Sequence, residues 1–303
     1  MRLLILGGTS FVGRAIADDA LAHGHDLTLF TRGVTGADLF PDADRRHGDR
    51  GTGDYASLAD GEWDAVIDVS AYYPRQIAQA LAAVHGRFRR YVFISTVSVY
   101  DNDKPAAQPD EDSPLLTPVR DTEAVTGDTY GGLKVACEDD VLAALGDRAT
   151  IVRPGIVAGP HDTTDRFTWW VRAASGGGDV TIPARPDQAV QVVDSRDLAR
   201  LTVRLAEDDV AGIFNGVGPV DATTLQGLFA ACATAAGTDA RFVATDADDA
   251  HPLVVADPAE EAVFLRSGDR ARAVGMPSTP LVQTATDVLA WDRSRGLPPL
   301  RVP

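Results

Sequence analysis

The chain of 303 residues lacks the features that define several large protein classes. Its only cysteines, Cys137 and Cys232, are far apart in the sequence and show no metal-type spacing. This fits a reducing compartment, and we expect no metal site. The first apolar run, residues 3–6, meets a glycine at once, so it is too short for a signal peptide or a membrane span. We therefore expect a cytoplasmic protein with no membrane association.

Basic residues are also scarce. The chain has 28 lysines and arginines against 44 acidic residues, a formal net charge of −16. A field of this sign repels phosphate backbones and anionic membranes, so we expect no nucleic acid partner. Only two of the basic residues are lysines, and one of them, Lys134, stands four residues after Tyr130.

Short apolar runs alternate with amphipathic stretches through the first half of the chain. The expected strands lie at 3–6, 26–30, 46–47, 65–69, 91–95 and 150–154, and the expected helices at 14–23, at 74–84 and around Tyr130. Continuous apolar runs are typical of parallel strands that are buried on both faces. The alternation predicts an α/β fold built on a Rossmann-type, doubly wound parallel sheet.

The second half of the chain is less regular. Residues 101–128 contain four prolines and many acids, and they are expected to form a long loop. After Pro154 the elements become shorter and richer in proline and glycine. We predict a nucleotide-binding domain formed by residues 1–154 with about 188–216. Residues 155–187 with 217–303 are expected to form a smaller, discontinuous C-terminal lobe that binds the substrate.

A glycine-rich turn links the first expected strand to the first expected helix. A dinucleotide pyrophosphate can lie against free backbone N–H groups at such a helix start. Gly7 would permit the tight turn and Gly13 would let helix and strand pack closely, whereas Ser10 stands where many such turns have another glycine. The expected cofactor contacts in this turn are Gly7, Gly8, Thr9, Ser10, Phe11, Val12 and Gly13.

The end of the second expected strand indicates the type of dinucleotide. A site for NAD usually places a carboxylate here to accept hydrogen bonds from the ribose 2′-hydroxyl. This chain has Thr31 and Arg32 instead, and a guanidinium suits a 2′-phosphate. The sequence therefore favours NADP(H), with NAD(H) as the alternative. Arg14, at the start of the first helix, is a second candidate for the same phosphate.

Tyr130 and Lys134 form the pattern with the clearest chemical meaning. Positions i and i+4 lie on one face of a helix, so the ammonium would stand one turn from the phenol. A tyrosine with a pKa near 10 is a poor base at neutral pH, and a fixed cation lowers that pKa. The pair predicts a tyrosine that exchanges a proton with a substrate.

Together with the glycine turn and residues 93–100, this pair resembles the extended short-chain dehydrogenase/reductases. That family contains sugar-nucleotide epimerases, dehydratases and related reductases. Residues 153–160, 193–199 and 213–216 are also similar to later segments of the family, in the same order. The resemblance covers most of the chain.

The resemblance implies a role for each of three residues. Tyr130 would be the general acid/base, and Lys134 would bind the nicotinamide ribose and lower the pKa of the tyrosine. Thr96 would donate a hydrogen bond to the reacting oxygen, with Ser95 as the alternative. The remaining cofactor contacts that it implies are Asp49, Arg50, Val69, Ser70, Ala71, Ser95 and Pro154.

The reaction is narrowed by residues that are missing. Relatives that dehydrate or decarboxylate sugar nucleotides carry acidic residues directly after the threonine, where this chain has Val97 and Ser98. We therefore expect an oxidoreductase acting on a carbonyl or hydroxyl group. An epimerase with tightly bound NAD is the first alternative. A nucleotide sensor or RNA-binding relative without catalysis is the second.

Substrate and assembly are less well defined by the sequence. The substrate is expected to be a small molecule. Candidate contacts to it are Val97, Ser98, Tyr73, Arg166, Trp170 and Arg185. The resemblance implies a homodimer formed through the helix at 74–84 and the helix that carries Tyr130.

Overall fold

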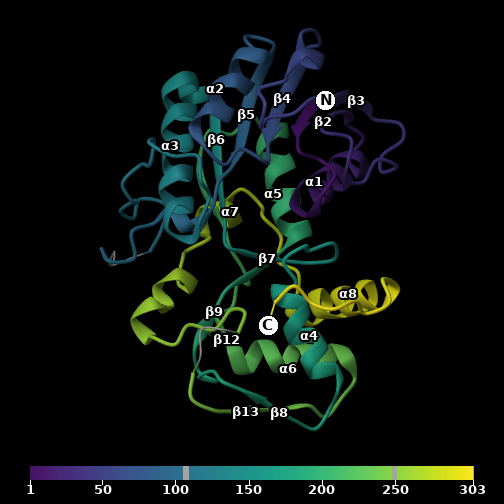
Figure 1. The fold of residues 1–303 in the computed structure, drawn as a ribbon, viewed down its shortest axis with the longest axis vertical. Coiled ribbons are helices and arrows are strands. Elements are labelled where there is room, and N and C mark those ends of the chain that lie inside the picture. Colours follow the sequence, from purple (N-terminus) through teal and green to yellow (C-terminus); the bar gives the residue numbers. More distant parts are fainter. Residues whose placement is uncertain (105–108, 248–250, 303) are drawn as a thin grey trace.

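The computed structural model describes residues 1–104, 109–247 and 251–302. Residues 105–108, which fall in the expected loop at 101–128, lie outside the described part of the chain. Figure 1 shows a larger part that contains a sheet flanked by helices and a smaller part below it. We call these the sheet lobe and the second lobe.

The sheet lobe is built on seven parallel strands. Their order is β11-β6-β5-β4-β1-β2-β3, and every neighbouring pair is parallel. The strands are β1 (Arg2–Leu6), β2 (Asp26–Thr31), β3 (Asp44–His47), β4 (Trp63–Asp68), β5 (Phe88–Ile94), β6 (Ala149–Pro154) and β11 (Gly212–Gly216). The predicted Rossmann-type α/β fold is confirmed.

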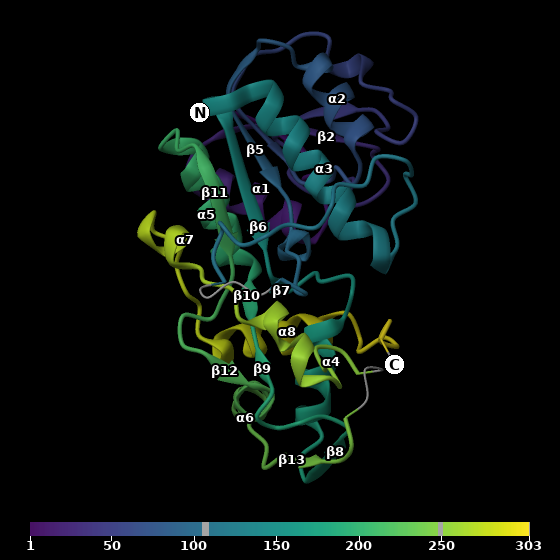
Figure 2. The same cartoon turned by 90° about the vertical axis from the view of Figure 1, so that its left-hand side faces the viewer.

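Helices cover both faces of this sheet. On one face α1 (Phe11–Ala22) packs against α5 (Ser195–Glu207), and on the other α2 (Pro74–Ala83) packs against α3 (Gly127–Leu145), as Figures 1 and 2 show. The first strand shows why its sequence is wholly apolar. Leu3 and Ile5 belong to the core under α1 and α5, whereas Leu4 and Leu6 belong to the core on the opposite face. Because alternate side chains point to opposite faces, a strand between two helical layers needs apolar residues throughout.

The second lobe has a separate apolar core that includes Trp170 and Phe229. Its helices are α4 (Arg166–Ser175), α6 (Leu225–Ala236) and α8 (Leu281–Ser294). Its paired strands are β8 (Asp179–Ile182) with β13 (Arg241–Ala244) and β9 (Ala189–Val190) with β12 (Thr223–Thr224).

The strands β7 (Ile156–Ala158) and β10 (Val192–Asp194) pair where the chain passes between the lobes. The helix α7 (Asp269–Ala273) packs beside β11 in the sheet lobe. Short 3₁₀ turns complete the fold: η1 (Ala56–Leu58), η2 (Val97–Val99), η3 (Gly146–Arg148) and η4 (Pro258–Phe264). The domain limits given above stay a prediction.

Two consequences follow for the position of a site. The carboxyl ends of the parallel strands meet at one edge, and β6 and β11 lead from that edge toward the second lobe (Figure 2). Ligands of open α/β sheets bind at this edge. Within the described ranges, no helix is long and apolar enough to cross a membrane.

Candidate active site

Two adjoining cavities lie at the carboxyl edge of the sheet. The first has a volume of about 450 Å³ and is lined by Thr96, Tyr130 and Lys134, among others. The second has a volume of about 480 Å³ and includes Thr31 and Arg32 in its wall. We call them the Tyr130 cavity and the Arg32 cavity. They share the lining residues Gly7, Ser10, Ser70 and Tyr72.

The glycine turn lies where the two cavities meet. Gly7 has a φ of +100°, and a Cβ there would lie 2.8 Å from Ser70 Oγ. A Cβ on Gly13 would come within 1.9 Å of the Gly7 carbonyl oxygen. Only glycine lets the turn and the first turn of α1 approach this closely. The exposed backbone at a helix start suits the pyrophosphate of a dinucleotide.

Nearly all residues expected to contact a cofactor line one of the two cavities. The exceptions are Gly8 and Ala71, which lie behind the cavity walls. Arg32 is exposed in the Arg32 cavity, and it forms no ion pair within the described ranges. Arg14, the second candidate for the 2′-phosphate, does not line that cavity; its Nη1 lies 3.5 Å from His161 Nδ1.

Arg50 lines the Arg32 cavity, but its donors are already used. Its two terminal nitrogens donate to the two carboxylate oxygens of Asp68, at 2.5 and 2.8 Å, and its Nε donates to Tyr55 Oη. Burial acts to raise the pKa of Asp68, but Arg50 holds it below its usual value. Arg50 is thus bound to the last residue of β4, and its contact with a cofactor stays a prediction. Asp49 also lines the cavity, where its carboxylate accepts a hydrogen bond from Gly51 N at 2.8 Å.

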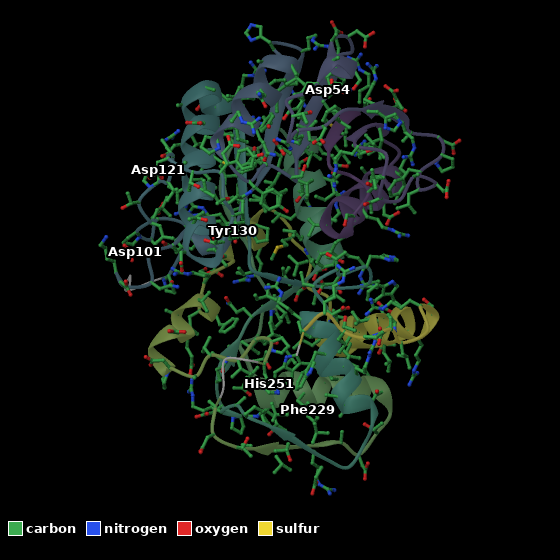
Figure 3. All side chains as sticks on the ribbon, viewed as in Figure 1. Asp54, Asp101, Asp121, Tyr130, Phe229 and His251 are labelled. Carbon is green, nitrogen blue, oxygen red and sulfur yellow. The ribbon has the colours of Figure 1, made fainter. Side chains whose placement is uncertain are left out.

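Tyr130 lies in the first turn of α3 at the level between the two lobes (Figure 3). Thr126 and Thr129 cap this helix reciprocally, which fixes where it begins. The following residue, Gly131, brings α3 against η2, since a Cβ there would lie 2.2 Å from the Ser98 carbonyl oxygen. This close packing places the Tyr130 phenol beside the Thr96–Ser98 segment.

The electrostatic surroundings of Tyr130 differ from those we expected. Burial raises the pKa of Tyr130 above 10. The neighbouring Thr96 hydroxyl and the positive charge of Arg166 act to lower the pKa, whereas Tyr72 adds to the rise. That Lys134 lowers this pKa stays a prediction. The cation that opposes the rise comes from the second lobe.

Lys134 is almost fully buried and held by the backbone. Its Nζ donates to the carbonyl oxygens of Ala71 and Ile94, both at 2.8 Å, and lies 4.1 Å from the centre of the Phe93 ring. Burial lowers the pKa of Lys134 to about 8, although nearby negative charges, Asp68 among them, oppose the change. The ammonium therefore joins the ends of β5 and the loop after β4, at the wall of the Tyr130 cavity.

The structure separates the two candidates for the oxygen-binding hydroxyl. Thr96 caps η2, where its Oγ1 accepts a hydrogen bond from Ser98 N at 3.1 Å, and it lines the same cavity as Tyr130. Ser95 donates instead to Glu138, which forms a buried ion pair with Arg153. Because the Ser95 hydroxyl is occupied within this pair, Thr96 fits the role better.

Only half of the expected substrate contacts reach the site. Val97, Ser98 and Arg166 line the Tyr130 cavity. Trp170 does not, because it is fully buried in the core of the second lobe and donates to the Pro252 carbonyl oxygen. Arg185 pairs with Glu261 away from the cavity.

Tyr73 is also not in the cavity wall. It precedes α2, and its hydroxyl accepts a hydrogen bond from Arg75. The neighbouring Tyr72 lies there instead, with its ring centre 6.5 Å from that of Tyr130. Of the two adjacent tyrosines, Tyr72 therefore lines the cavity and Tyr73 does not.

The second lobe supplies several wall residues that the sequence did not indicate. They are Thr163, Thr164, Gln191, Val263 and Phe264. They come from three separate segments with no shared periodicity, so no sequence signal links them. Among them Thr164 is informative, because its hydroxyl accepts a hydrogen bond from Arg166 Nε at 3.2 Å. Within the described part of the chain Arg166 forms no ion pair, so its remaining donors are free.

Comparison with known proteins agrees with this geometry. The model of the NAD dependent epimerase/dehydratase family matches residues 57–216. The chain belongs to this family. It is thus an extended short-chain dehydrogenase/reductase, as its motifs predicted.

Individual relatives differ in what their names describe. The chloroplast stem-loop binding protein of 41 kDa b of Arabidopsis thaliana is 26% identical, over 97% of this chain and 80% of that protein. The dTDP-4-dehydrorhamnose reductase of Mycolicibacterium smegmatis is 29% identical, over 92% of this chain and 81% of that enzyme. The structure of the UDP-glucose 4-epimerase of Bifidobacterium longum with NAD⁺ and UDP has a TM-score of 0.72 and 17% identity, over 98% of this chain and 99% of that one. At that identity the likeness concerns the fold.

Proposed function

We propose that this protein is an NADP(H)-dependent oxidoreductase that transfers hydride to or from a carbonyl or hydroxyl carbon of a small molecule. The observation that carries the proposal is the convergence of Tyr130, Thr96 and Lys134 in one cavity that adjoins the glycine turn. When bound, the nicotinamide supplies the hydride. The chain has to position the substrate oxygen and exchange its proton.

The surroundings of Tyr130, Thr96 and Lys134 suggest a different role for each of them. Because burial keeps the pKa of Tyr130 high, the phenol is protonated at neutral pH and can act as the acid in reduction. Thr96 would hold the substrate oxygen beside the phenol and steady the charge that develops on it. Lys134 would bind the ribose with the donor that its two backbone contacts leave free.

The choice of NADP(H) rests on Arg32. An exposed guanidinium that forms no ion pair with the described residues, in the cavity that Thr31 and Gly33 also line, suits a 2′-phosphate. In a chain with a net charge of −16, most arginines in the described part of the sheet lobe are paired with carboxylates, so an unpaired one in a cavity there is an exception. NADP(H) that is exchanged at each turnover supports a reductase more than an epimerase.

Arg166 supports a substrate that carries a negative charge. It lines the Tyr130 cavity opposite the sheet, and Val263 and Phe264 add an apolar surface to the same wall. We propose a carbonyl compound with an apolar body and one anionic group. Of the candidates that the sequence offered for substrate binding, we still propose Val97, Ser98 and Arg166, because they line this cavity.

The test is to identify the nucleotide that the purified protein releases on denaturation and then to assay NADPH consumption. Matched pairs of carbonyl compounds serve as probes: 4-carboxybenzaldehyde with benzaldehyde, and acetoacetate with ethyl acetoacetate. We expect little bound nucleotide and NADPH-dependent reduction that is faster for the charged member of each pair. Failure to oxidise NADPH with any probe, together with copurified NAD, would contradict the proposal.

The epimerase alternative is favoured by the family itself and by the fold of the Bifidobacterium longum epimerase. An epimerase returns the hydride to the same substrate molecule, so it keeps its NAD. Tightly bound NAD in the purified protein would therefore favour this alternative over the reductase.

An RNA-binding role is raised by the name of the Arabidopsis thaliana relative. The net charge of −16 opposes it, because RNA binding needs a basic surface. Titration with a stem-loop RNA over a range of salt concentrations distinguishes an RNA-binding protein from the proposed oxidoreductase. We expect no salt-dependent binding.

The homodimer, formed through α2 and α3, and the cytoplasmic location stay predictions.

A further inference from the structure

One segment of the second lobe, residues 251–268, forms part of the Tyr130 cavity wall. It contributes Val263 and Phe264, and the Phe264 side chain is buried. Between residues 251 and 268, all of which the structure describes, there is one short 3₁₀ turn, η4, and no strand. The segment therefore has no ladder of backbone hydrogen bonds that would hold it against its neighbours. Its position depends on side chains.

Two glutamine side chains attach the segment. Gln191 lies between β9 and β10, and its amide binds both backbone groups of Arg266. Its Nε2 donates to the carbonyl oxygen at 2.9 Å, and its Oε1 accepts from the N–H at 3.0 Å. Gln188, directly before β9, donates to the Leu253 carbonyl oxygen at 2.8 Å and accepts from Val255 N at 3.0 Å. Each amide thus takes the place of one residue of a neighbouring strand.

The two glutamines hold opposite ends of the segment. Gln188 is fully buried, does not line the cavity, and binds residues that precede η4. Gln191 lines the Tyr130 cavity, and its partner Arg266 stands two residues after Phe264. Gln191 therefore fixes the end of the segment that carries the apolar part of the cavity wall.

The side chain of Arg266 extends this attachment to the sheet lobe. Its guanidinium carbon lies 4.2 Å from the centre of the Tyr100 ring, and its Nη2 donates to Asn102 Oδ1. Tyr100 directly follows η2, the turn that Thr96 caps. The backbone of Arg266 is thus bound by Gln191 and its side chain by the segment that follows Thr96. A shift of residue 266 would move the apolar wall relative to the reacting groups.

The contact at Arg266 requires a neutral amide. An amide carries a donor and an acceptor on one planar group, whereas an ionised carboxylate has acceptors only and a methionine has no strong donor or acceptor. A neutral hydrogen bond contributes modestly to stability. Because the second lobe has its own apolar core, loss of the two bonds should loosen the segment without unfolding the lobe.

We propose that Gln191 is a positioning residue that determines specificity. By holding Arg266 it fixes Val263 and Phe264 against the apolar body of the substrate. This inference rests on the proposed function and names the side chain that sets the position of the apolar wall. A loosened segment would occupy the binding position for only a fraction of the time, so the apparent affinity for substrates that contact this wall would fall by that fraction.

The first experiment needs no substrate. Hydrogen–deuterium exchange with mass spectrometry measures how strongly the amides of residues 260–268 are protected. We expect Gln191→Met to raise the exchange rate there by about three- to tenfold, because the Arg266 amide loses its acceptor. Gln226→Met, which changes an exposed glutamine of α6, is the matched control. Unchanged exchange in Gln191→Met would overturn the inference.

The second experiment compares two anionic probes with NADPH as the reductant. 4-Carboxybenzaldehyde presents an apolar ring to the wall, and acetoacetate has little apolar surface. We expect Gln191→Met to raise KM for 4-carboxybenzaldehyde by about three- to tenfold and KM for acetoacetate by less than about twofold. The values of kcat and the affinity for NADPH should stay nearly unchanged, since hydride and proton transfer take place at the opposite wall. An equal rise in KM for both probes, or a loss of NADPH affinity, would overturn the role in specificity.

A double-mutant cycle with Phe264→Leu distinguishes a hold on the wall from a direct contact between Gln191 and the substrate. If Gln191 acts through Phe264, the double variant should have nearly the same KM for 4-carboxybenzaldehyde as Phe264→Leu alone. Additive effects would overturn the inference. If the wild type reduces neither probe, the proposed function fails, and the exchange measurement still decides whether Gln191 holds the segment.

Discussion

The two walls of the Tyr130 cavity differ in how many hydrogen-bond donors of their charged side chains are already used by other protein groups. On the sheet side Lys134 is fixed on two carbonyl oxygens, and the hydroxyl of Ser95 is bound to Glu138, which forms a buried ion pair with Arg153 outside the cavity wall. On the second-lobe side Arg166 forms one side-chain hydrogen bond with the described residues, to Thr164. The sheet lobe thus presents a rigid surface and the second lobe presents free donors.

This difference separates two tasks. A rigid wall suits the part of the reaction that is common to the family, where a proton and a hydride have to meet at fixed positions. A wall with unused donors and apolar side chains suits recognition of one particular substrate. We propose that the sheet lobe sets the chemistry and that the second-lobe residues of the cavity wall contribute to the choice of substrate; these are Thr163, Thr164, Arg166, Val263 and Phe264.

The largest effect is expected at Tyr130, in the cavity wall that the sheet lobe forms. Tyr130→Phe removes only the hydroxyl, so we expect turnover to fall by ~10²–10⁴-fold, the usual size of an acid/base contribution. Cofactor affinity should stay nearly unchanged because the ring remains. Steady-state NADPH oxidation and a fluorescence titration measure the two quantities. Wild-type turnover in this variant would remove Tyr130 from the mechanism.

Lys134→Met should disturb both cofactor binding and the fold. The variant loses a charged donor to the ribose, so we expect cofactor affinity to fall by about 10- to 100-fold. It also leaves the buried carbonyl oxygens of Ala71 and Ile94 without this donor, which destabilises the protein. Calorimetry with and without NADPH separates the two effects. Unchanged affinity would show that Lys134 is purely structural.

The buried ammonium also predicts how stability changes with pH. The pKa of Lys134 is about 8 in the folded protein and 10.5 in the unfolded chain. Between these values the unfolded chain binds more protons, so the free energy of unfolding should rise with pH. The difference between wild type and Lys134→Met should therefore change from about pH 8 to 10.5 and stay constant below pH 8. A difference that is constant over the whole range would contradict the buried, charged lysine.

Arg32→Ala tests the part of the site that faces the nucleotide. We expect the affinity for NADPH to fall by about tenfold and the affinity for NADH to stay the same, because only NADPH carries the 2′-phosphate. Parallel titrations with both nucleotides measure this. An equal loss for both would indicate that Arg32 contacts a group they share.

The smallest effect is expected at Arg166, in the cavity wall that the second lobe forms. Arg166→Gln should remove the preference for 4-carboxybenzaldehyde over benzaldehyde, a change of a few fold for an exposed charge pair. It should also raise the pKa of Tyr130 further, because the opposing charge is lost. Competition assays measure the first change, and an NMR titration of protein labelled with ¹³C at Cζ of tyrosine measures the second. An unchanged preference would place the substrate elsewhere in the cavity.

The same difference between the walls explains what could be predicted from the sequence. The sheet lobe has strands buried on both faces, which give apolar runs such as residues 3–6, and a glycine turn that no other residue can replace. Thr96, Tyr130 and Lys134 follow strands or lie on a helix, so their relative positions follow from the fold. The buried contacts of Lys134 could not be predicted, because they depend on how two loops pack around it.

The second lobe gave less reliable predictions for a physical reason. An aromatic residue on a helix can face a core or a cavity, and Trp170 faces the core. An arginine can bind a ligand or a carboxylate, and Arg185 pairs with Glu261. Phe264 reaches the cavity from a segment about 100 residues after Arg166, and nothing in the sequence relates the two.

Titration of the purified, nucleotide-free protein with NADPH and with NADH tests the central claim most directly. The glycine turn and Arg32 predict saturable binding of both nucleotides, with NADPH at least about tenfold tighter. A preference for NADH, or NAD that cannot be removed without denaturation, would contradict the account of an exchangeable NADP(H) cofactor and support an epimerase.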